Sequence, residues 1–126
     1  MLKLTRAQAA TRQIEAAIAA LDAGHYDLAI TLAGAAEGMF KRKGRYLFRF
    51  LTEHEKLAAF ERRTVINHLN RELVWLKHDK RPNVLKIRRS MAVSMITRAA
   101  SKLKNWSPGI KRFRSWLIEN LDEVYR

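Results

Sequence analysis

The fold is decided by residues 16–36, AAIAALDAGHYDLAITLAGAA. Both halves of this stretch are rich in alanine, and small side chains allow two helix axes to approach closely. The break between the halves runs from Asp22 to His25 and includes Gly24, which makes it short enough to join antiparallel helices. We therefore predict a tightly packed helical hairpin near the start of the domain.

Helical patterns continue on both sides of this hairpin. Thr5 and Gln8 form a capping box before the first helix, and Ser107-Pro108 matches the preferred start of the last one. Gly totals 5 and Pro 2, too few for a turn-rich β protein. The predicted apolar faces are Ile14, Ile18 and Leu21; Leu28, Leu32, Ala35, Ala36 and Met39; Val65, Leu69, Leu73 and Leu76; Ile87, Met91 and Met95, in a helix reaching to about Leu103; and Ile110, Phe113, Leu117 and Val124. The sequence thus predicts one all-α domain over residues 1–126, a bundle of four main helices and a shorter C-terminal one.

The positive charge is unevenly distributed. The chain has a formal net charge of +13, and residues 41–114 alone carry 21 basic and five acidic groups. Residues 1–40 and 115–126 are each slightly acidic. A concentrated positive field favours a polyanionic partner such as RNA, DNA or an acidic protein surface. A solvated basic face without a ligand is the alternative interpretation.

Several classes of site and location are disfavoured by composition. The chain has no cysteine, and its four histidines lack the helical spacing of metal ligands, so we expect no metal and no cofactor. The longest unbroken apolar run, Ala16 to Leu21, is six residues, against about 20 for a membrane-spanning helix. No apolar core of signal-peptide length lies near the first residues. We therefore expect a soluble, cytoplasmic protein that does not bind a membrane.

Arg71 and His78 are the strongest candidates for chemistry. On a helix their seven-residue separation is about 700° of rotation, so the two side chains lie within about 20° of one face. Arginine suits phosphate, and histidine can exchange a proton near neutral pH, so both can converge on one small anion. Alternatively, they belong to a helical polar face that ends in cations because these suit the helix dipole.

Two stretches of the chain resemble the HEPN superfamily (higher eukaryotes and prokaryotes nucleotide-binding domains). Residues 20–29 and 32–37 are similar to its opening hairpin and its Ala-Ala-Glu motif, although Gly38 here replaces the basic residue that follows. Arg71 and His78, with six residues between them, resemble its Arg–His signature. Residues 70–82 also resemble a group of small uncharacterised bacterial proteins. The resemblance implies a HEPN-like up-down helical bundle from a bacterium, acting as a homodimer.

The catalytic members of that superfamily are metal-independent endoribonucleases, while many other members only bind or scaffold. By resemblance, His78 acts as the acid or base on the ribose hydroxyl, and Arg71 binds the scissile phosphate. Asn70, Glu72 and Lys77 are supporting residues, and Glu72 departs from the family's usual Asn, Asp or His. We therefore expect an RNA- or polyanion-binding regulatory module. The alternatives are an endoribonuclease of toxin–antitoxin or phage-defence type, and a subunit that binds an acidic protein.

Basic residues outside the Arg–His pair are candidate nucleic-acid contacts. Residues 41–50, KRKGRYLFRF, interleave cations with aromatic rings, which can neutralise phosphates and stack bases. In the alternative interpretation the rings close one end of the bundle and only the charges face water. Trp75, Trp106 and Trp116 are expected in the core or a dimer interface. The candidate contacts are Lys41, Arg42, Lys43, Arg45, Arg49, Lys80, Arg81, Arg88 and Arg89.

The endoribonuclease hypothesis predicts cleavage of RNA by the purified protein in the presence of EDTA, because no metal takes part. His78→Ala removes the acid–base group and should abolish cleavage while the circular dichroism spectrum stays unchanged. Gel analysis of a labelled RNA measures the outcome. RNA that stays intact at high protein concentration would rule out this hypothesis.

Overall fold

The computed structural model describes residues 1–40 and 86–124. Every regular element in these two ranges is an α-helix, so the all-α prediction is confirmed for them. The helices are α1 (Arg6–Asp22), α2 (Tyr26–Gly38), α6 (Arg89–Ala100), α7 (Pro108–Glu119) and α8 (Leu121–Val124). The predicted helix with Val65, Leu69, Leu73 and Leu76 lies outside the described residues. None of the described helices is both long and apolar enough to cross a membrane.

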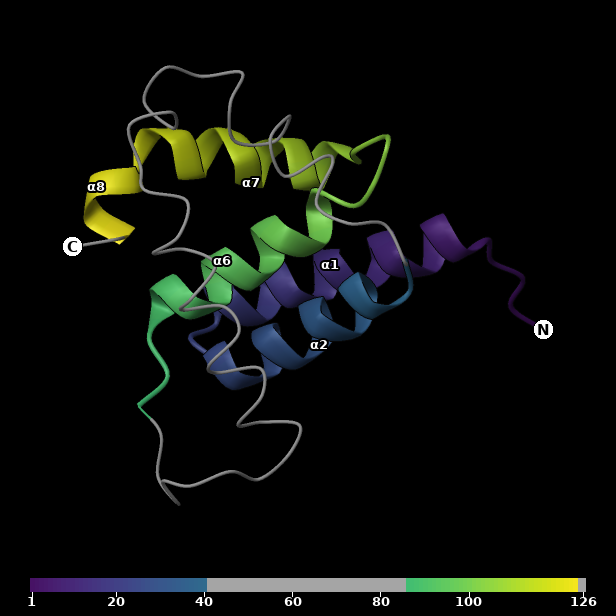
Figure 1. Cartoon of the computed structure of the whole chain (residues 1–126), viewed down its shortest axis with the longest axis horizontal. Coiled ribbons are helices and arrows are strands. Elements are labelled where there is room, and N and C mark those ends of the chain that lie inside the picture. Colours follow the sequence, from purple (N-terminus) through teal and green to yellow (C-terminus); the bar gives the residue numbers. More distant parts are fainter. Residues whose placement is uncertain (41–85, 125–126) are drawn as a thin grey trace.

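Helices α1 and α2 form the predicted antiparallel hairpin. Thr5 and Gln8 make the predicted capping box: each backbone N–H donates to the other's side-chain oxygen, at 2.9 and 3.1 Å. Gly24 joins the helices in the left-handed region, with φ of +80°, where a residue with a side chain is strained. The backbone N–H of His25 donates to the carbonyl of Ala20 at 2.8 Å, which closes the turn. The two helices lie side by side along their length (Figure 1).

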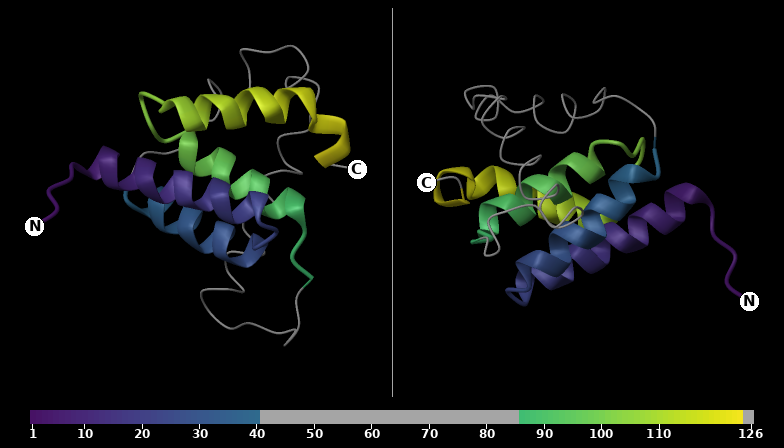
Figure 2. Two further views of the ribbon diagram at one scale, coloured as in Figure 1. Left: turned by 180° about the vertical axis from the view of Figure 1, so that it is seen from behind. Right: turned by 60° about the horizontal axis from the view of Figure 1, so that its bottom comes forward.

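Helix α6 is the central element. Eight of its twelve residues are buried, and it contacts both α1 and α2 (Figures 1 and 2). A helix that is buried on most of its sides needs apolar or small residues all round, and α6 has them. Its buried residues are Ala92, Val93, Ser94, Met95, Ile96, Thr97, Ala99 and Ala100.

The predicted buried face of α2 is wrong in part. Leu28 is 52% exposed and Ala35 is exposed, whereas the buried side chains include Ala29, Ile30 and Ala33. The reason is that α2 packs against two helices, α1 and α6, and the close approach of three axes selects small residues for the contact. Leu28, at 52% exposure, lies on a side of α2 that these two helices leave uncovered.

The ends of the last helices also differ from prediction. Helix α6 ends at Ala100 rather than near Leu103, although Leu103 is still buried in the connection that follows. Helix α7 begins as predicted, with the Ser107 hydroxyl accepting from the Ile110 N–H at 3.3 Å. It stops at Glu119, since the Asn120 backbone leaves helical geometry, with φ of −119° and ψ of 18°. The Asn120 side chain donates to the Trp116 carbonyl at 2.8 Å. The predicted apolar residue Val124 is buried in the separate helix α8.

Replacing Thr5 by alanine should lower the free energy of unfolding by about 1 kcal/mol, because it removes the hydroxyl that accepts the Gln8 backbone N–H at the start of α1. Urea denaturation followed by circular dichroism measures the loss. Thr11→Ala is the matched control within the same helix, where the hydroxyl donates only to the Ala7 carbonyl. It should change stability by less than about 0.5 kcal/mol, because alanine is the better helix former. Equal losses for both variants would contradict a specific role of the cap.

Candidate nucleic-acid interface

The proposed catalytic residues lie outside the part of the chain that the structure describes. These are Arg71 and His78 with the supporting Asn70, Glu72 and Lys77, and their roles stay predictions. The same holds for Trp75 and for most of the candidate nucleic-acid contacts, namely Lys41, Arg42, Lys43, Arg45, Arg49, Lys80 and Arg81. Arg88 and Arg89 are the two candidate contacts within the described ranges.

Arg88 and Arg89 differ in their surroundings. Arg88 is exposed and precedes the first turn of α6. The Arg89 guanidinium lies 3.2 Å from a carboxylate oxygen of Glu123, and its Cζ atom lies 5.9 Å from the centre of the Trp116 ring. Arg89 therefore joins the start of α6 to α7 and α8, and part of its charge is already balanced within the fold.

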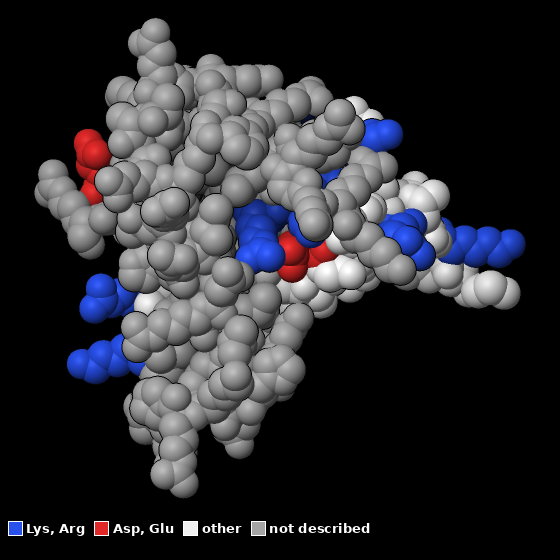
Figure 3. Space-filling model, in the orientation of Figure 1, with Lys and Arg blue, Asp and Glu red and all other residues white. Residues whose placement is uncertain are grey.

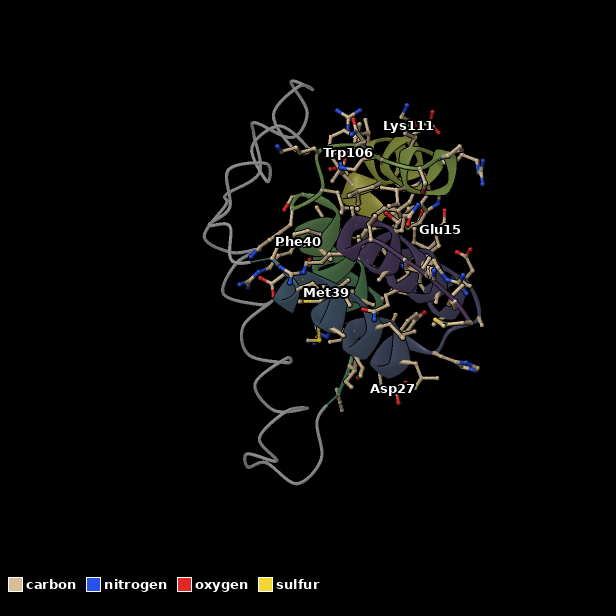
Figure 4. All side chains as sticks on the ribbon, turned by 90° about the vertical axis from the view of Figure 1, so that its right-hand side faces the viewer. Glu15, Asp27, Met39, Phe40, Trp106 and Lys111 are labelled. Atoms are coloured by element: carbon tan, nitrogen blue, oxygen red, sulfur yellow. The ribbon has the colours of Figure 1, made fainter. Side chains whose placement is uncertain are left out.

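A mostly buried carboxylate joins the ends of α2 and α6. Glu37 is 8% exposed, and its Oε1 atom lies 3.0 Å from Arg98 Nε and 3.1 Å from Lys102 Nζ. The Lys102 ammonium also donates to the Phe40 carbonyl at 3.4 Å, just beyond α2 (Figure 4). This cluster fixes the end of α2, where the chain leaves the α1–α2 hairpin. Because it contains two cations and one carboxylate, its net charge is positive.

Sequence reasoning did not find the Glu37 cluster. Glu37 is 61 positions from Arg98 and further still from Lys102, so no spacing rule connects the carboxylate with its two cations. The one local signal is that a glutamate stands among the small residues of α2, where a buried charge requires a partner. Only the packing of α6 against α2 identifies Arg98 and Lys102 as those partners.

The connection from α6 to α7 gathers cations on the surface. From Lys86 to Ile118 the sequence has no Asp or Glu and nine basic residues: Lys86, Arg88, Arg89, Arg98, Lys102, Lys104, Lys111, Arg112 and Arg114. Lys104 and Lys111 are exposed near the start of α7, where the helix dipole adds partial positive charge. On the face shown in Figure 3, Lys and Arg side chains lie beside the acidic side chains near the centre, and a second acidic group lies apart from them at the upper left.

Trp106 is held firmly beside these cations. Its ring N–H donates to the Ala100 carbonyl at 2.9 Å, and the Arg114 Cζ atom lies 5.7 Å from the ring centre. Trp106 and Trp116 are half-buried and pack against the core, which is one of the two locations predicted for them. In Figure 4 both Trp106 and Lys111 lie at the beginning of α7.

The remaining observations concern candidate metal ligands and similarity to known proteins. Among residues 1–40 and 86–124 no group of three His, Cys, Asp or Glu side chains could hold a metal ion. No family model, curated protein or solved structure matches the chain. The HEPN resemblance therefore depends on the sequence motifs alone and stays a prediction.

Replacing Glu37 by glutamine should lower the free energy of unfolding by about 1–3 kcal/mol, because it leaves two neighbouring, partly buried cations without their carboxylate. Glu123→Gln is the matched control, since it removes the carboxylate of the exposed pair with Arg89. Glu123 is 68% exposed, and its loss should cost about 0–1 kcal/mol. Chemical denaturation of both variants measures the difference. Equal, small losses would show that the Glu37 cluster does not stabilise the fold.

Proposed function

We propose that this protein is a cytoplasmic RNA-binding module of HEPN-like architecture that acts as a homodimer. The observation that supports the proposal most directly is the stretch from Lys86 to Ile118, which carries nine basic residues and no acidic one. Exposed cations of this stretch surround the start of α7. Such a surface attracts a phosphate backbone, and the release of counterions supplies the free energy of binding.

The fold distinguishes two groups among these cations. Arg89, Arg98 and Lys102 have carboxylate partners in Glu123 and Glu37, so they mainly join helices. The second group comprises exposed residues near the start of α7, namely Lys104 on the α6–α7 connection and Lys111 on α7. The proposal assigns phosphate binding to the second group.

The described part of this surface suits backbone contacts better than reading of bases. Lysine binds phosphate as a point charge and carries no sequence information. Trp106, the aromatic side chain beside it, is half-buried and already contacts Arg114. We therefore expect binding through this surface to depend weakly on RNA sequence and strongly on salt.

Affinity for a single-stranded RNA should fall linearly on a plot of log K against log salt concentration. The double variant Lys104→Ala with Lys111→Ala should reduce the slope by about 1.4, because each lysine that contacts a phosphate contributes about 0.7. Fluorescence anisotropy over a range of salt concentrations gives both slopes.

Arg12→Ala removes an exposed cation from α1 and serves as the control, with an unchanged slope expected. Affinity that is independent of salt would refute the proposal. A double variant with the wild-type slope would refute the assignment to the α6–α7 surface.

A further inference from the structure

A cleft of about 520 Å³ lies between α1 and α7. Its walls include the apolar side chains of Ile18, Phe113 and Trp116, and three charged residues also line it. Glu15 and Asp22 come from α1, and Arg112 comes from α7. Figure 4 shows Glu15 on the side of α1 that faces α7. The cleft thus combines apolar surface with two carboxylates and one guanidinium.

The charges at the two ends of the cleft are not equivalent. A Cβ atom at Gly109 would lie 3.2 Å from Glu15 Oε1 and 3.7 Å from Arg112 Nη2, so this carboxylate and this guanidinium both lie beside the start of α7. The positive end of the α7 dipole also balances Glu15 there. Asp22 is exposed at the last residue of α1, where the helix dipole adds partial negative charge. The Asp22 end of the cleft therefore favours a cation.

The segment Met1–Leu4 has the complementary chemistry. The large hydrophobic residues that are exposed in the described ranges are Met1, Leu2, Leu4 and Leu28, at 110%, 67%, 40% and 52%. Three of the four lie in this one segment, which extends away from the helices ahead of α1 (Figures 1 and 2). Lys3 stands between the two leucines. Clustered exposed apolar residues of this kind indicate an interaction surface.

The segment is too short to occupy the cleft of its own molecule. Thr5 is held at the start of α1 by the capping box, and Ile18 lies about 20 Å further along the helix at 1.5 Å per residue. Four extended residues span at most about 14 Å. To enter its own cleft, the segment would also have to reverse direction at Thr5. A second copy of the chain is not limited in this way.

We propose that the segment Met1–Leu4 of one copy occupies the α1–α7 cleft of a second copy. Leu2 and Leu4 pack against Ile18, Phe113 and Trp116, and Lys3 faces Asp22. Reciprocal exchange of the two segments gives a two-fold symmetric dimer. The inference rests on the homodimer included in the proposed function, and it assigns that dimer an interface.

The oligomeric state tests this interface. In sedimentation equilibrium at about 0.3 M NaCl, where the repulsion between two basic copies is screened, the wild-type protein should be a dimer. Leu2→Ser with Leu4→Ser should raise the dimer dissociation constant at least tenfold. Leu28→Ser removes an equally exposed leucine from α2 and should leave the constant unchanged. Because all three positions are exposed, the fold should survive, and circular dichroism checks this.

Charge reversal gives the more specific test. Lys3→Glu and Asp22→Lys should each weaken the dimer several-fold, and the two changes together should restore it, because they exchange the charges of one pair. A dimer that is indifferent to the leucine and charge variants would overturn the proposed interface but not the homodimer. A monomeric wild-type protein would overturn both.

RNA binding is measured separately by anisotropy, so its failure is distinguishable from failure of the interface. Binding to anionic vesicles that requires Leu2 and Leu4, while the dimer is unaffected by their loss, would overturn the interface in favour of a membrane contact.

Discussion

The close approach of α6 to the α1–α2 hairpin is the constraint on which the rest of the described structure depends. Alanines in all three helices are buried at this junction, including Ala17 in α1, Ala33 in α2 and Ala99 in α6. Small side chains bring the helix axes together, so α6 is covered on most of its sides. Its buried polar side chains then need partners within the helix. The Thr97 hydroxyl donates to the Val93 carbonyl at 2.8 Å, and the Ser101 hydroxyl to the Arg98 carbonyl at 2.6 Å.

The burial of α6 also determines which charged side chains are paired within the fold and which are exposed to a ligand. A glutamate on the covered side of α2 is taken out of water, and it is stabilised only because α6 brings two cations to it. Arg89 is engaged in a similar way at the other end of α6. Among the described residues, exposed cations lie before α6, at Lys86 and Arg88, and also on its connection to α7 and on α7 itself. The formal charge of residues 86–118 is therefore larger than the positive charge that is exposed to a polyanion.

The accuracy of the sequence predictions follows from the range of the interactions involved. The capping box of Thr5, the turn at Gly24 and the start of α7 at Ser107 were predicted correctly, because each depends on residues a few positions apart. The buried face of α2 was partly wrong, since a periodic pattern assumes one neighbour and α2 has two. The end of α7 was missed because the backbone leaves helical geometry at one residue, Asn120, while the apolar pattern continues past it to Val124. Arg71 and His78 lie outside the described residues, so their roles still depend on the sequence alone.

The amino-acid sequence by itself determined the helical class, the main helix starts and the concentration of positive charge in one part of the chain. These properties follow from local backbone preferences and from composition, and neither needs knowledge of what lies nearby in space. Only the tertiary structure decided that Glu37 pairs with Arg98 and Lys102, that Leu28 faces outward, and that α1 and α7 leave a cleft between them. Each of these depends on contacts between separate helices, and the sequence carries no local signal for the neighbour that a helix face will meet.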